Sequence, residues 1–123
     1  MNNSSGRPQT LFAVAVASKS DLGNYPSFVK EFLDESRLPG FDYAAAIAEC
    51  PPILGGIYDA HLAGLAEYIA FAKKIDNPKW VNDKSRFLPE PVFFGGRHSR
   101  GIMLATTAFS MRRRNLFCGE IRI

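Results

Sequence analysis

Three consecutive arginines, Arg112 to Arg114, are the side chains of this sequence most suited to binding. A guanidinium group can bind a carboxylate, a phosphate or a backbone carbonyl. The triplet lies between apolar residues in the stretch FSMRRRNLF. Successive residues point about 100° apart in a helix, and to opposite sides in a strand, so one patch cannot use all three. We therefore expect at least one arginine to fold back onto the protein, capping helix carbonyls or pairing with a carboxylate.

A second group that could bind a charged ligand is the stretch GGRHSRG, at residues 95–101. It precedes an expected helix, whose free N–H groups and dipole could hold an anion together with the guanidinium groups. The spacing matches no phosphate-loop pattern, so a solvated turn is favoured over a ligand site. The candidate anion-binding residues are Arg97, His98, Ser99 and Arg100.

The remaining chemistry-bearing side chains form no recognisable motif. Cys50 and Cys118 have neither metal-ligand nor disulfide-framework spacing, and no metal site and no cofactor is expected. His61 lies on the apolar stripe of an expected helix, where a core histidine hydrogen-bonded to a neighbour is the simplest interpretation. A Cys–His nucleophile would require a proximity that sequence does not reveal.

Charge is distributed unevenly along the chain. Residues 1–83 carry seven Lys/Arg and ten Asp/Glu, a balance of −3, whereas residues 84–123 carry eight and two, a balance of +6. The sum is the net charge of +3. Such asymmetry indicates either a basic face for an anionic partner or complementary faces within one fold.

Local signals predict mainly helix. The run Leu11 to Ala17 is expected to be a buried strand or the start of a helix. Asp42 is a plausible N-cap, and the apolar stripe from Ile57 to Lys74 is the clearest helical pattern. Lys79 to Val81 is expected to form one more turn. The expected helices cover about residues 25–38, 43–49, 57–74 and 100–107, with residues 109–114 continuing the last one or forming a separate turn.

The rest of the chain is expected to be irregular or extended. Residues 86–96 contain prolines at 89 and 91, which argue against a central strand. The terminal stretch NLFCGEIRI, at residues 115–123, alternates weakly at Ile121 and Ile123 and is the candidate for a short C-terminal strand. The predicted fold class is therefore mainly α, a small single-domain helical bundle with an extended Pro/Phe-rich segment. Residues 1–9 would be a disordered tail and residues 10–123 one helical domain.

The longest apolar run near the start has seven residues, against the roughly 20 that span a bilayer, so no membrane association is expected. No signal peptide is recognisable, and a reducing cytoplasmic setting is the simplest interpretation.

The C-terminal third resembles a module of small bacterial proteins, some of which look like antitoxins or are encoded beside predicted toxins. Its pattern is a Trp, F-L, an aromatic pair, a helix and then A-F followed by arginines. Here Thr106-Thr107 stands where that pattern has a proline, and Ser110-Met111 lengthen the approach to the arginines. The matching residues are Trp80, Phe87, Leu88, Phe93, Phe94, Ala108, Phe109, Arg112, Arg113, Arg114, Asn115, Leu116 and Phe117.

This resemblance implies an interaction module without a catalytic residue. The favoured function is an antitoxin-like protein that neutralises or regulates a partner protein, such as a toxin, through a basic, aromatic C-terminal face. Nucleic-acid binding by the same face is the alternative, a small Cys/His enzyme is the third, and homodimerisation stays open. The expected partner-binding residues are Trp80, Phe93, Arg97, Arg100, Arg112, Arg113 and Arg114.

Overall fold

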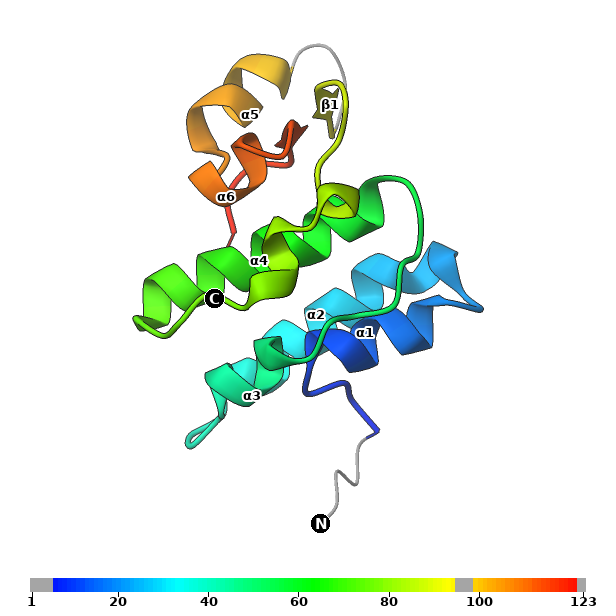
Figure 1. Ribbon diagram of the computed structural model, residues 1–123, viewed down its shortest axis with the longest axis vertical. Helices are drawn as coiled ribbons and strands as arrows, with labels where there is room; N and C mark the ends of the chain where they lie inside the picture. Colours follow the sequence, from blue (N-terminus) through cyan, green and yellow to red (C-terminus); the bar gives the residue numbers. More distant parts are fainter. Residues whose placement is uncertain (1–5, 95–98, 122–123) are drawn as a thin grey trace. The chain divides into compact units, whose positions relative to one another are not determined.

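The computed structural model describes residues 6–94 and 99–121. Within them the protein is mainly helical, with six α-helices, three single turns of 3-10 helix and two short strands (Figure 1). The chain divides into two compact units, one ending at Leu54 and the other beginning at Gly55. No helix in the described part of the chain is long and apolar enough to cross a bilayer.

Unit 1 contains three helices, α1 (Leu11–Ser18), α2 (Tyr25–Ser36) and α3 (Tyr43–Ala48), with a 3-10 turn at Leu22–Asn24. Helix α1 packs against both others. The apolar run that begins at Leu11 is thus a helix and not a strand, because the Thr10 side chain caps it by accepting a hydrogen bond from the Ala13 N–H. Asp42 caps α3 as predicted, accepting from the Ala45 N–H at 3.0 Å.

Unit 2 is organised around its longest helix, α4 (Ile57–Lys73). The helix α6 (Phe109–Arg112) and 3-10 turns at Lys79–Asn82 and Lys84–Arg86 pack on α4. Helix α6 approaches closely because Gly64 of α4 has no side chain, and the Ser110 hydroxyl donates to the Gly64 carbonyl at 2.8 Å. The predicted long apolar helix and the predicted turn after Pro78 are both confirmed.

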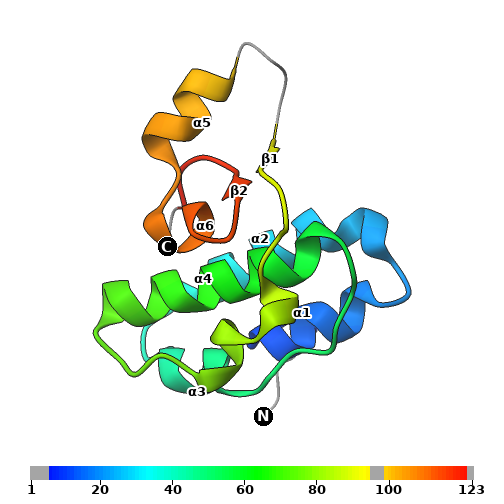
Figure 2. The same cartoon turned by 45° about the horizontal axis from the view of Figure 1, so that its top comes forward.

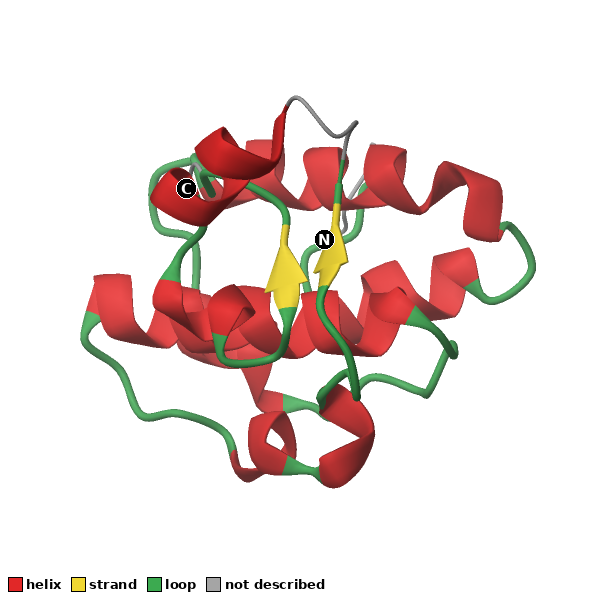
Figure 3. Ribbon diagram, turned by 90° about the horizontal axis from the view of Figure 1, so that it is seen from above, coloured by secondary structure: helices red, strands yellow, loops and turns green. Residues whose placement is uncertain are grey.

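A two-stranded parallel sheet joins distant parts of unit 2. Strand β1 (Val92–Phe93) pairs with β2 (Leu116–Phe117), Val92 opposite Leu116, and the two arrows run side by side in Figure 3. The short strand expected in the stretch NLFCGEIRI is thus formed by its Leu116 and Phe117, and Ile123 lies outside the described residues. Pro91 directly precedes β1, which leaves the Val92 N–H free to donate to the Asn115 carbonyl at 2.8 Å.

The chain segment between the strands contains the helix α5 (Arg100–Thr106). Only Thr107 and Ala108 separate α5 from α6. In Figures 1 and 2, α5 lies on the side of α6 and β2 that faces away from α4. The expected helices at residues 100–107 and 109–114 are thus two separate short helices.

Candidate protein-binding surface

Arg114, the last residue of the triplet, is fully buried in unit 2. Its guanidinium donates to the Glu67 carboxylate, to the Ser110 carbonyl at 2.7 Å and to the Val81 carbonyl at 2.6 Å. Burial lowers the pKa of Arg114, and the bond to Glu67 opposes that change. The expectation that one arginine folds back onto carbonyls and a carboxylate is confirmed. Arg114 is accordingly removed from the expected partner-binding set, because its charge does not reach the surface.

The other two arginines of the triplet are both exposed but differ in their contacts. Arg113 is exposed and contacts Glu67 at 3.2 Å, and its guanidinium also lies 5.0 Å from the centre of the Phe87 ring. Arg112, in the last turn of α6, is exposed. The three side chains are thus divided between the interior and the surface, as their directions along the chain require. Arg112 and Arg113 are therefore the members of the triplet that a partner can reach.

The two expected aromatic anchors are half-buried and already take part in packing. The Phe93 ring stacks on Phe117 with their centres 4.6 Å apart, and the Arg100 guanidinium lies 5.1 Å from the Phe93 centre. The Trp80 ring has the Arg86 guanidinium 5.0 Å from its centre. These contacts place both rings in the framework of the surface, with only part of each ring accessible.

The candidate anion-binding residues are only partly described. Arg97 and His98 lie outside the described residues, whereas Arg100 is exposed at the start of α5. Ser99 directly precedes α5, and its side chain makes no capping hydrogen bond to the helix. An anion site here stays a prediction.

Helix α5 is exposed on more than one side. None of its seven residues is buried. Ile102 and Leu104 are 63% and 46% exposed. Residues two positions apart point to nearly opposite sides of a helix, so apolar groups face solvent on both sides of α5. Met103, between them, is half-buried and lies over Gly119. A short helix that buries so little is poorly stabilised by its own packing.

Two further exposed rings meet at the start of α6, the helix that follows α5 in the chain. Phe71 of α4 is 67% exposed and Phe109, at the start of α6, is 46% exposed. Their rings meet edge to face with centres 5.3 Å apart. We define the α5–α6 surface as the exposed side chains of these helices together with Phe71. Its members are Phe71, Arg100, Ile102, Leu104, Phe109 and Arg112.

The residues predicted to bind a partner did not include the apolar members of this surface. Ile102 and Leu104 read as ordinary core positions of an amphipathic helix, and Phe71 belongs to an apolar stripe that is otherwise buried. Two features of the sequence could have indicated that α5 is exposed. The helix is short, and the glycine at position 101 has no side chain to bury, so few of its residues can pack against a core.

A second buried arginine was also missed. Arg86 is 1% exposed and lies 3.6 Å from the Asp59 carboxylate, itself buried at the first turn of α4. The other Asp59 oxygen accepts from the Gly55 N–H at 2.9 Å. Asp59 thus fixes both the glycine turn and the segment before β1. Two of the eight Lys/Arg residues after position 83, Arg86 and Arg114, are therefore internal.

Burial shifts the pKa values of Cys118 and His61, two of the groups on which the Cys/His alternative depends. Burial raises the pKa of the Cys118 thiol, which favours the protonated and unreactive form. Burial also lowers the pKa of His61 to about 4. Both cysteines are free thiols. Within the described residues, no group of three His, Cys, Asp or Glu side chains could hold a metal ion.

His61 should make the protein less stable in mild acid. Its folded-state pKa of about 4 is below the ordinary value of 6.5, so between these values the unfolded chain binds the extra proton. Stability is thus full above pH 6.5 and falls as the pH drops toward 4. Between pH 7 and pH 5 we expect a loss of about 1 to 2 kcal/mol in the free energy of unfolding, measured by urea titration.

His61→Gln should remove most of this pH dependence. In a His98→Asn background, one imidazole remains, and its NMR titration gives the pKa directly. A midpoint near 6.5 for that imidazole would show that His61 is hydrated and that this prediction is wrong.

Comparisons with known proteins identified no relative of the chain. A scan against protein-family models, a search of curated proteins and a search of solved structures each found no match to the chain. The resemblance to antitoxin-like modules stays a prediction from the residues themselves.

Proposed function

We propose that the protein is a cytoplasmic, antitoxin-like binding module that uses the α5–α6 surface to neutralise or regulate a partner protein. The observation that carries this proposal is α5 itself, a helix with no buried residue that exposes Ile102 and Leu104. Ordering such a helix costs conformational entropy that its own contacts offset poorly. A partner that covers it would supply the missing apolar burial.

The composition of this surface favours a protein partner. Large apolar and aromatic side chains next to arginines are typical of interface centres, where a few such anchors carry most of the binding energy. Phe109 and Phe71 form a rigid pair of rings, and Arg100 and Arg112 add positive charge. The partner surface we propose is therefore apolar with a rim of carboxylates. Two free cysteines agree with a reducing compartment.

Nucleic acid is the weaker candidate because phosphate binding needs many accessible cations. Arg114 and Arg86 are internal, and Arg113 is engaged with Glu67. The Phe93 ring, which could otherwise stack on a base, is already stacked on Phe117. Three of the eight basic groups after position 83, and the Phe93 ring, are thus less available to contact a polynucleotide.

The test is capture of the partner from the native cells with the tagged full-length protein, followed by variants in the purified complex. Leu104→Asp should weaken binding at least tenfold, because it places a carboxylate in an apolar contact, an effect above about 1.4 kcal/mol. Ile53→Asp is the matched control, since Ile53 is 52% exposed but belongs to unit 1. It should leave the affinity unchanged.

Salt and nuclease treatment separate the alternatives. A protein complex held by apolar contacts persists at high salt and after nuclease, whereas phosphate binding falls steeply with salt. Capture that is nuclease-sensitive, or equally weakened by Ile53→Asp and Leu104→Asp, would contradict the proposal.

A further inference from the structure

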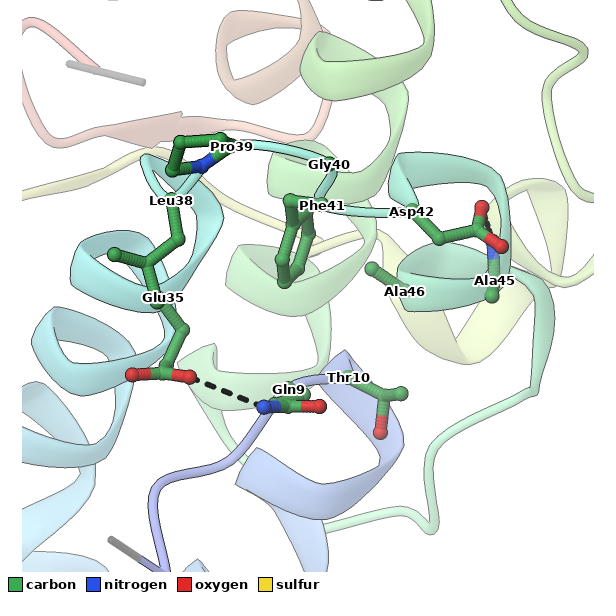
Figure 4. A pocket seen from close by; sticks show the side chains of 10 residues that line it. All are labelled: Gln9, Thr10, Glu35, Leu38, Pro39, Gly40, Phe41, Asp42, Ala45 and Ala46. Carbon is green, nitrogen blue, oxygen red and sulfur yellow. Dashed lines mark hydrogen bonds between the residues drawn. The ribbon is translucent and has the colours of Figure 1, made fainter. Parts of the chain in front are cut away.

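Unit 1 contains a pocket of about 380 Å³ that is independent of the α5–α6 surface. It lies where the start of α1, the end of α2 and the start of α3 come together, and Figure 4 shows the residues around it. Leu38, Phe41 and Ala46 form an apolar wall. At one end, the Glu35 carboxylate points toward Gln9. Asp42 is at the opposite end, turned toward Ala45.

The Glu35 side chain is the unusual feature of this pocket. Its carboxylate is only 9% exposed. One oxygen accepts from the neutral Gln9 amide at 3.1 Å and the other from Arg7 at 3.4 Å. Charge-assisted hydrogen bonds in proteins usually measure about 2.7 to 2.9 Å, and a carboxylate has about four acceptor sites. Each carboxylate oxygen thus has one partner, and acceptor sites remain that a closer cationic group could use.

The charge around the pocket favours a positive ligand. Among the described residues that line it, Glu35 and Asp42 are the only charged ones, and both are acidic. The C-terminal end of α2, which carries partial negative charge, adds to the field. Unit 1 as a whole has four Lys/Arg and six Asp/Glu in residues 1–54, a balance of −2. The Arg7 contact shows that a guanidinium can already reach the Glu35 carboxylate.

We propose that this pocket binds the side chain of a lysine or arginine from a second polypeptide. The aliphatic stem would lie against Phe41 and Leu38, and the cationic group would bind Glu35. A lysine or arginine side chain has an apolar stem and a charged end, and it is therefore complementary to a pocket whose apolar wall leads to the Glu35 carboxylate. The aromatic ring of Phe41 adds attraction for a cation. The inference does not depend on the proposed function of the C-terminal surface.

Nα-acetyl-lysine amide and Nα-acetyl-arginine amide are suitable probes, followed by NMR on the labelled full-length protein. We expect saturable shifts of the Phe41 and Ala45 amide signals that weaken with salt. Nα-acetyl-norleucine amide, which has a similar stem without the charge, should give none. A free diamine that binds as tightly as these probes would contradict the assignment to a polypeptide side chain.

Glu35→Gln should weaken binding of the lysine probe about tenfold or more, because it removes a charged hydrogen bond. Glu49→Gln removes the same charge outside the pocket and should have no effect. Should Glu35→Gln fail to fold, Phe41→Leu keeps the carboxylate and should still weaken binding severalfold. Absence of saturable shifts in the wild type, or equal affinity in Glu35→Gln or Phe41→Leu, would overturn the proposal.

Discussion

Replacing Arg114 with alanine is expected to lower the free energy of unfolding by about 3 to 5 kcal/mol. The change leaves the Glu67 carboxylate without its closest partner and the Ser110 and Val81 carbonyls without their donor. Trp80 is the only tryptophan and belongs to unit 2, so its fluorescence during urea unfolding reports on this unit.

The neighbouring arginines are natural controls for this variant. Arg112→Ala should change stability by less than about 0.5 kcal/mol, since its side chain is exposed. Arg113→Ala should cost about 1 kcal/mol or less, as expected for a partly exposed ion pair. Arg114→Lys should recover little, because one ammonium group cannot reproduce the forked contacts. Equal effects of the three alanine variants would refute the assignment of Arg114 as the internal member.

Gly64→Ala is expected to destabilise unit 2 by about 1 to 3 kcal/mol, although alanine normally favours a helix by up to about 1 kcal/mol. A β-carbon at this position would overlap the Met111 sulfur and lie 3.1 Å from its terminal methyl carbon. Met111 is fully buried and has little room to move. Thermal and urea unfolding, monitored by circular dichroism, measure the loss.

A double-mutant cycle tests the proposed cause. In a Met111→Ala background the overlap is gone, so Gly64→Ala should be neutral or stabilising. Gly101→Ala is the matched glycine control, because a β-carbon added at this position of α5 would meet no neighbouring segment within 4 Å. It should be neutral or slightly stabilising. A loss from Gly64→Ala that persists without Met111 would show that the cause is not this contact.

Helices α2, α3 and α4 could be predicted because their boundaries depend on neighbouring residues. Asp42 caps α3 with its own side chain, and Pro26 occupies the first turn of α2. The α4 helix ends shortly before Pro78, again a local signal. Such features act within one turn of the helix and are therefore visible in the sequence.

The pairing of β1 with β2 and the choice of the buried arginine could not be predicted, because both depend on residues far apart in the chain. Strands β1 and β2 have two residues each, too few for a periodic pattern, and the whole of α5 separates them. Arg114 is buried because the chain turns at Asn115, which has a φ of 65° and donates to the Leu88 carbonyl. Three consecutive arginines predict that at least one is internal. Which of them is internal depends on contacts with Glu67 and Val81, which are distant in the chain.

The Arg114 contacts also determine when unit 2 can form during synthesis. Its partners, Glu67 and Val81, leave the ribosome well before the arginine does, and β1 precedes its pairing strand by more than twenty residues. Unit 1 has all its helices once residue 54 is complete. Nascent chains that stop before residue 114 therefore lack the buried partner of the Glu67 carboxylate and expose a strand without its partner. Such truncated products would be recognised by cellular proteases as unfolded.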